Sequence, residues 1–160
     1  MAITANNTKL LCSIGNNSYE KIALLMEVPE LGGAPEKIDV TTLGDPVKKY
    51  IPGIKDYGDL VFKFLYDNSG PEANFRVLKG LDDAGETAKF KLVYPDNTAH
   101  VFDAIPSVKI DSGAINGAVT FSATMMLQSD IETVNDGDDS YSGGYSYEEN
   151  PDEGNEPIED

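Results

Sequence analysis

The sequence predicts a mainly β domain of the α+β class: an antiparallel β-sandwich or open barrel, flanked by one short helix near residues 70–80. Apolar and polar residues alternate along several short segments that end in turn residues, which is the pattern of half-buried strands. A single segment carries apolar residues at helical spacing. With 160 residues, of which 40% are hydrophobic and 9% aromatic, the chain is long enough for one domain with a buried core.

About six or seven strands are predicted from this alternation and its turn boundaries. They lie at residues 10–14, 19–28, 36–42, 58–66, 87–94, after the turn at 95–97, and at 113–128. Periodicity alone fits segment 19–28 to a helix or a strand, and its flanking turn residues favour a strand. The alternation after residue 97 breaks at Pro106, which predicts a bulge or a sheet edge. In the last segment, Ile115 and Val119 are expected on the same side as Phe121.

The predicted helix has start and stop signals in the sequence. Ser69 and Glu72 have the spacing of a capping box, and Pro71 lies in the expected first turn, where its missing N–H costs little. Gly80 is expected to end the helix. A helix this short must be stabilised by packing onto a sheet.

The connection between strands 36–42 and 58–66 is unusually long and apolar. It has about fifteen residues, whereas ordinary hairpin loops have ~2–5. A turn at Pro52-Gly53 is expected to fold this loop, residues 43–57, back on itself. A projecting apolar loop on a small domain predicts an interaction surface. The predicted contact residues are Thr41, Thr42, Leu43, Val47, Tyr50, Ile51, Pro52, Gly53, Ile54 and Tyr57.

The charge is distributed unevenly along the chain. The formal net charge is −16, from 12 basic and 28 acidic residues. Ten of the acids and none of the bases lie in residues 135–160, which leaves a net charge of −6 for residues 1–134. The first part is therefore predicted to be the folded domain, and the acidic, Gly- and Ser-rich residues 135–160 a disordered tail. An acidic protein is a poor candidate for specific nucleic-acid binding.

No set of residues in the sequence suits catalysis or metal binding. Cys12 is the only cysteine and His100 the only histidine, so neither a zinc site nor a disulfide can be assembled within the chain. The run 136–140 resembles the start of a calcium loop but has Tyr141 where glycine is required. Acid pairs such as Asp56 and Asp59 lie in turns, where Asp is favoured for backbone reasons. The sequence predicts no enzyme, cofactor or metal.

The start of the chain is polar and no apolar run is long enough for a membrane span, so a soluble protein made in the cytoplasm is expected. A single cysteine is consistent with that compartment.

Four motifs in order give the sequence a family resemblance. They are VPELGG at 28–33, IDVTTL at 38–43, YIPGIKD at 50–56, and the alternating strand LVFKFLY at 60–66. Together they resemble the major tail tube proteins of long, flexible-tailed, lambda-like bacteriophages. The resemblance extends over about residues 5–130, through the short helix and the last strand.

The resemblance implies a structural virion protein. It implies a β-sandwich with one helix that assembles into hexameric rings, which stack into a hollow tail tube for DNA ejection. Its partners would be itself and the tape-measure, tail-tip and tail-terminator proteins, with assembly in the host cytoplasm and no membrane. An acidic lumen would repel DNA and let it pass, which the net charge of residues 1–134 favours. Some members of the family carry an added C-terminal immunoglobulin-like domain, for which residues 135–160 are expected to be too short and too polar, and the acidic tail matches no known family feature.

Two other functions stay open from the residues alone. A non-enzymatic β-sandwich that decorates a capsid or binds glycan would present an exposed aromatic platform, but the chain has no Trp and its aromatics lie mostly on apolar strand faces. A small hydrolase that uses acid pairs is the third hypothesis.

Overall fold

The computed structural model describes residues 2–15 and 18–135. Among these residues the chain forms ten strands and one helix. In chain order they are β1 (Lys9–Ser13), β2 (Glu20–Ile22), β3 (Leu25–Glu27), β4 (Pro35–Asp39), β5 (Tyr50–Lys55), β6 (Leu60–Leu65), α1 (Asn74–Ala84), β7 (Ala88–Val93), β8 (Thr98–Ile110), β9 (Thr120–Leu127) and β10 (Glu132–Asn135). The predicted tail lies, from residue 136 on, outside the described residues, as does the run 136–140.

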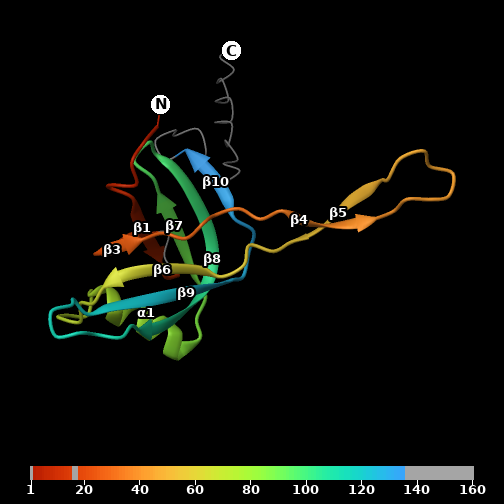
Figure 1. Ribbon diagram of the computed structural model, residues 1–160. Coiled ribbons are helices and arrows are strands. Elements are labelled where there is room, and N and C mark those ends of the chain that lie inside the picture. The colour runs from red at the N-terminus through yellow and green to blue at the C-terminus, as the bar shows by residue number, and fades with distance from the viewer. Residues whose placement is uncertain (1, 16–17, 136–160) are drawn as a thin grey trace, which may run out of the picture.

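The main sheet is antiparallel and curls into a half-barrel, so the predicted fold class is confirmed. Its strand order is β2-β1-β7-β8-β9-β6-β3, and β10 also pairs with β8. The long strand β8 joins the two halves: residues 98–101 pair with β10 and residues 104–110 with β9 on the same side. In Figure 1, β6 and β9 run across the direction of β1 and β7, which shows the curl.

The core lies on the concave side of this sheet. Alternate residues of the strands point into it, including five phenylalanines that are almost fully buried: Phe62, Phe64, Phe90, Phe102 and Phe121. The rings of Phe64 and Phe121 stack with centroids 5.1 Å apart. Leu78 and Leu81 of α1 complete the cluster from the open side. Each fully buried large apolar side chain stabilises the fold by roughly 1.5–3 kcal/mol.

The helix begins and ends later than the sequence predicts. Its N-cap is Ala73, and no side chain caps it, so the capping box is wrong. Instead the buried side chain of Asn74 holds the first turn: its Nδ2 donates to Leu65 O (2.8 Å) and Ala23 O (2.9 Å). The helix continues through Gly80 to Gly85, whose φ of 63° is left-handed and therefore suits glycine.

Segment 19–28 forms strands, as predicted, but not one strand. Leu24 has a φ of 63°, and this break sends β2 and β3 to opposite edges of the sheet. The backbone N–H of Leu65 donates to Leu24 O at 3.0 Å, which anchors the break to β6. Alternation alone gives no sign of such a break, because the residue that adopts it is an ordinary leucine.

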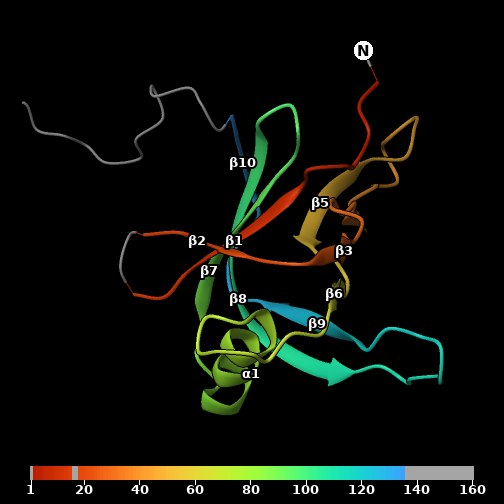
Figure 2. The same ribbon diagram turned by 90° about the vertical axis from the view of Figure 1, so that its left-hand side faces the viewer.

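Segment 113–128 is a strand only from Thr120 onward. Ile115 is 102% exposed and Val119 50% exposed, so their predicted place beside Phe121 is wrong. The carboxylate of Asp111 accepts hydrogen bonds from the hydroxyls of Thr120 (2.9 Å) and Ser122 (3.1 Å), which closes the β8–β9 hairpin. The intervening connection projects beyond the sheet (Figure 2).

Pro106 lies inside β8 without a bulge on the β9 side, where it is opposite Met125. The prediction of an edge holds locally, because β7 begins at Ala88, opposite Ala104, so that β8 has β9 as its one strand neighbour at Pro106. The N–H of Val108 points away from β9, since it donates to the Asp82 carboxylate at 3.0 Å. The nitrogen of Pro106 is on the same side, because alternate residues share an orientation. Strand β10 was not predicted from the sequence.

Candidate assembly interface

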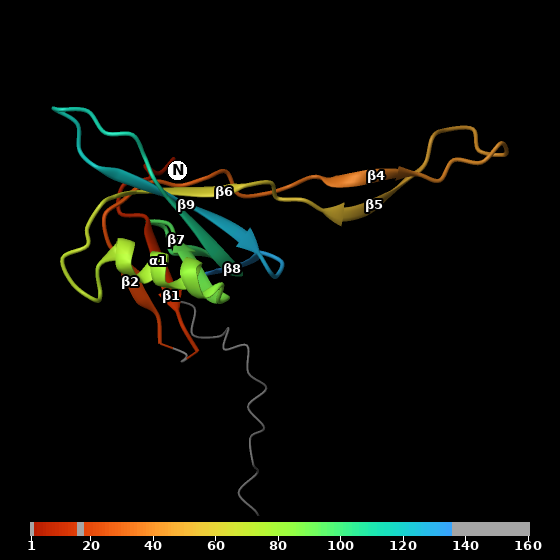
Figure 3. The same ribbon diagram turned by 90° about the horizontal axis from the view of Figure 1, so that it is seen from below.

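Residues 35–55 form a hairpin that stands apart from the main sheet. Strands β4 and β5 pair only with each other, and the hairpin projects far from the body (Figures 1 and 3). We call it the arm. The predicted loop 43–57 is therefore the tip of the arm together with its second strand and its base. In Figure 3 the arm and the β8–β9 connection lie at opposite ends of the molecule.

The predicted turn at Pro52-Gly53 is wrong. Both residues lie in β5, where Pro52 is opposite Lys37, and the chain reverses between residues 41 and 48 instead. Proline is tolerated there because β5 has a single strand partner, so one of its edges needs no N–H donor. Lys37 pairs with Pro52 and Pro35 pairs with Lys55. The two pairs are two residues apart on β4 but three residues apart on β5, so β5 contains a one-residue bulge.

Side chains hold the tip of the arm in a defined shape. The Asp45 carboxylate accepts hydrogen bonds from the N–H (2.8 Å) and the hydroxyl (2.9 Å) of Thr42, and it pairs with Lys49 Nζ at 2.6 Å. The hydroxyl of Thr41 accepts from the N–H of Lys49 at 2.9 Å. The Lys49 and Thr42 hydrogen bonds lower the pKa of Asp45. A sequence reading does not reveal this network, because its partners are several residues apart.

The arm exposes apolar side chains that nothing in the described chain covers. Leu43 is 109% exposed, Ile54 90% and Val47 66%. Ile38 and Ile51 are direct cross-strand neighbours and each is about half exposed. An isolated two-stranded hairpin is marginally stable in water, so an apolar one indicates a surface that becomes buried in a contact.

The opposite face of the arm is more polar. Tyr50 is opposite Asp39, and Lys37 Nζ lies 5.9 Å from the centroid of the Tyr50 ring, within range of a cation–π contact. The arm thus has one aliphatic face and one aromatic, charged face. The alternation of Ile38 and Val40 in the sequence marks the aliphatic face, but only the β4–β5 register shows that Ile51 joins it.

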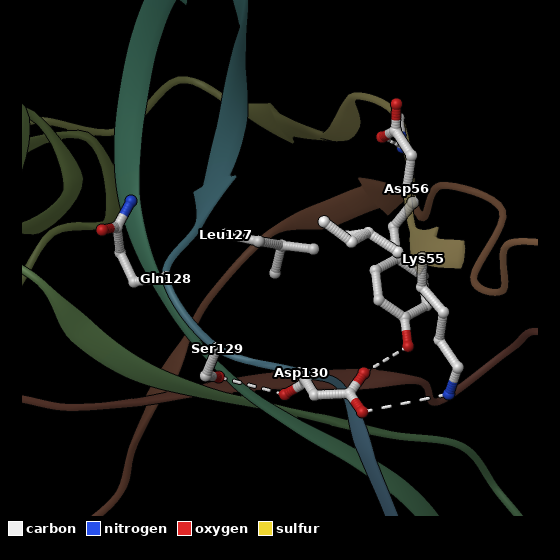
Figure 4. A pocket seen from close by; sticks show the side chains of 9 residues that line it. Lys55, Asp56, Leu127, Gln128, Ser129 and Asp130 are labelled. Carbon is white, nitrogen blue, oxygen red and sulfur yellow. Dashed lines mark hydrogen bonds and ion pairs between the residues drawn. The ribbon is translucent and has the colours of Figure 1, made fainter. Parts of the chain in front are cut away.

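The base of the arm is attached to the body at Asp130. The hydroxyl of Tyr57 donates to the Asp130 carboxylate, and Lys55 Nζ lies 3.9 Å from the same group (Figure 4). The hydrogen bond from Tyr57 lowers the pKa of Asp130. Residues 54–58 and 127–130 line an open cleft of about 590 Å³ around these contacts. Gly33 packs against Asp56 O so closely that a Cβ would collide with that oxygen.

Nine of the ten predicted contact residues lie on the arm, and Tyr57 lies at its base. Eight of them are exposed on the arm, namely Thr41, Thr42, Leu43, Val47, Tyr50, Ile51, Pro52 and Ile54. Gly53 is half-buried in the bulge, and a Cβ there would lie 3.1 Å from Glu36 O. Tyr57 is half-buried at the base, where it anchors the arm.

Cys12 lies in β1 and His100 in β8, and burial shifts the pKa of each toward its neutral form. Burial raises the pKa of the Cys12 thiol to about 11, so it is protonated and unreactive at neutral pH. Burial also lowers the pKa of His100, whose Nδ1 lies 3.0 Å from the Thr133 hydroxyl. Across the described residues, no three His, Cys, Asp or Glu side chains come together as a metal site would require. No described helix is long and apolar enough to cross a membrane.

The described part of the chain is a curled antiparallel domain with a projecting arm whose apolar side chains are exposed. The chain belongs to the phage tail tube protein family, whose model matches residues 11–136. It is thus a structural, non-enzymatic component of the phage particle. The predicted family is confirmed. No curated protein sequence matches the chain.

Solved structures share the fold at low sequence identity. A chain of the anti-feeding prophage baseplate has a TM-score of 0.68 at 12% identity, covering 84% of this chain and 97% of that one. A chain from the tail of an empty gene transfer agent particle with C6 symmetry has a TM-score of 0.67 at 17% identity, covering 83% and 99%. The SPP1 tail tube has a TM-score of 0.64 at 16% identity, covering 84% and 80%.

Proposed function

We propose that this protein forms hexameric rings that stack into the hollow tail tube of a long, flexible-tailed phage. The observation that carries the proposal is the arm, whose aliphatic residues are exposed although they lie on an ordered, hydrogen-bonded hairpin. Membership of the tail tube family supports it, as does the C6 symmetry of the gene transfer agent tail, whose chain has the same fold.

The arm is the element that joins subunits. It projects from one end of the body, so a contact between the arm and another part of the next copy is heterologous. Heterologous contacts close into rings or continue as filaments, and a stacked tube needs both. The contact residues are the eight predicted residues that are exposed on the arm, joined by Ile38 and Val40 on the aliphatic face.

The tube conducts DNA without retaining it. A net charge of −6 on residues 1–134, repeated around each ring, gives a lumen that repels phosphate. Residues 1–134 are the assembling domain, and assembly takes place in the host cytoplasm with tape-measure, tail-tip and tail-terminator proteins as partners.

The proposal is tested by electron microscopy of concentrated purified protein and of two matched variants. Ile51→Asp should abolish rings and tubes while the monomer stays folded, because the carboxylate would be buried only in the contact. Ile14→Asp is the control, since Ile14 is 49% exposed and Ile51 48%, and Ile14 lies off the arm. Tubes from Ile51→Asp that match the wild type would remove the arm from the interface.

A further inference from the structure

One outward face of the sheet carries four lysines, although the protein is strongly acidic. Lys21 of β2, Leu11 of β1 and Lys91 of β7 are direct cross-strand neighbours, so they share a face. Lys9 and Lys89 each lie two residues from a member of this row. They point the same way, because side chains alternate along a strand. We call the four lysines the lysine face.

The lysine face is directed away from the core. The intervening residues of the same strands, such as Leu10 and Phe90, are fully buried on the other side. Lys9, Lys21 and Lys89 are exposed, and the ammonium of half-buried Lys91 lies over a tyrosine ring.

Two lysines outside this face are held in close ion pairs, whereas Lys9, Lys21 and Lys89 are not. Lys49 pairs with Asp45 at 2.6 Å, and Lys79 pairs with Asp83 at 2.7 Å. Within the described part of the chain, no acidic group lies in ion-pair range of Lys9, Lys21 or Lys89.

The chain leaves the sheet beside this face. Lys91 pairs with Val101 of β8, and Val101 pairs with Glu132 of β10, so β10 continues the same row of residues. Strand β10 ends at Asn135, opposite Thr98. The next residues, 136–160, contain ten acids and no base.

We propose that residues 136–160 bind the lysine face of their own chain through ion pairs between their carboxylates and Lys9, Lys21 and Lys89. In β8 and β10, two acidic residues, Asp103 and Glu132, share that face with the four lysines. The lysines outnumber these acids, so the face has a net positive charge. The complementary negative charge lies in residues 136–160. These residues follow β10, which is two strands from β7 in the sheet.

The distances allow the contact. Strands in a sheet are ~4.8 Å apart, so β7 is about 10 Å and β2 about 19 Å from the end of β10. Three extended residues span about 10 Å and six about 20 Å, so Asp138 and Asp139 can reach β7, and the acids from Glu148 on can reach β2. A short tether keeps the acids at a local concentration on the order of millimolar, which compensates for the weakness of each exposed ion pair.

Paramagnetic relaxation enhancement tests the proposal on the full chain. A nitroxide is attached at Ser146→Cys, next to the acidic pair Glu148 and Glu149; buried, protonated Cys12 should stay unlabelled. The measurement uses a concentration at which sedimentation shows a monomer. The amide signals of Lys21 and Lys89 should lose intensity with the oxidised label and recover when it is reduced or when salt is raised. Unchanged signals there would overturn the proposal.

A matched pair of double variants and a mixing experiment complete the test. In the spin-labelled chain, the double variant Lys21→Glu with Lys89→Glu should restore the intensity of the amide signals at positions 21 and 89. The double variant Lys63→Glu with Lys109→Glu changes the β6–β9–β8 half of the sheet and should leave the loss of intensity as it is. Equal effects of the two pairs would show non-specific attraction and contradict the assignment. In the mixing experiment, chain that carries the spin label but no ¹⁵N is added to ¹⁵N-enriched chain without the label. The amide signals of Lys21 and Lys89 should then keep their intensity. A loss of intensity would show that the tail binds another copy instead of its own chain.

Discussion

Truncating the most exposed side chain of the arm should weaken assembly without weakening the fold. Leu43 is 109% exposed, so Leu43→Ala removes no packing from the monomer, and its free energy of unfolding should stay within about 0.5 kcal/mol of the wild type. In the contact, however, the variant loses three carbons of buried surface. At about 0.8 kcal/mol per carbon this is roughly 2 kcal/mol per contact.

That loss appears as a change in the critical concentration for tube formation. Since about 1.4 kcal/mol corresponds to a factor of ten, the critical concentration should rise roughly thirtyfold. It is measured by pelleting tubes over a concentration series, with denaturant unfolding of the monomer alongside. Ile115→Ala is the comparison, because Ile115 is 102% exposed at the opposite end of the molecule. A critical concentration that Leu43→Ala leaves unchanged and Ile115→Ala raises would refute the reasoning.

Three further predictions concern the body and the base of the arm. Asn74→Ala should destabilise the fold by about 2–4 kcal/mol in denaturant unfolding, since Leu65 O and Ala23 O lose their donor; an effect below that of a surface substitution would contradict it. Gly33→Ala should cost roughly 1–3 kcal/mol because its Cβ meets Asp56 O, whereas Gly70→Ala, in open space, should be neutral. The pKa of Asp130 is lowered in the folded protein, so its contribution is present above the unfolded pKa and is lost as pH falls through the folded value. Amide exchange at residues 55–58, corrected for intrinsic rates, should therefore become faster in acid, and Asp130→Asn should remove that pH dependence.

The sheet was predictable because its information is local. Strands such as β7 and β6 carry alternating apolar residues between turns, and that period decides which face is buried. Errors arose where a distant contact decides the local structure. Asn74 sets the start of the helix through Leu65 and Ala23, and Asp111 closes the β8–β9 hairpin ahead of Thr120. Neither partner can be found from spacing.

The arm was predicted as an interaction surface, but its form was not. Its apolar residues and length are visible in the sequence, whereas Pro52-Gly53 imitates a turn signal and is in fact part of a bulged strand. The turn at 41–48 is held by the Asp45 contacts to Thr42 and Lys49, and no known turn motif in the sequence predicts these contacts. The attachment at Asp130 depends on a residue far along the chain.

The central claim is that an exposed apolar arm joins copies of this protein into a tube. The most direct test is a cryo-electron microscopy reconstruction of filaments grown from the purified protein. The account predicts a hollow tube of six-subunit rings in which Leu43, Ile51 and Ile54 lie buried against a neighbouring subunit. A tube in which these three side chains stay in solvent, or a protein that remains monomeric at every concentration, would contradict it.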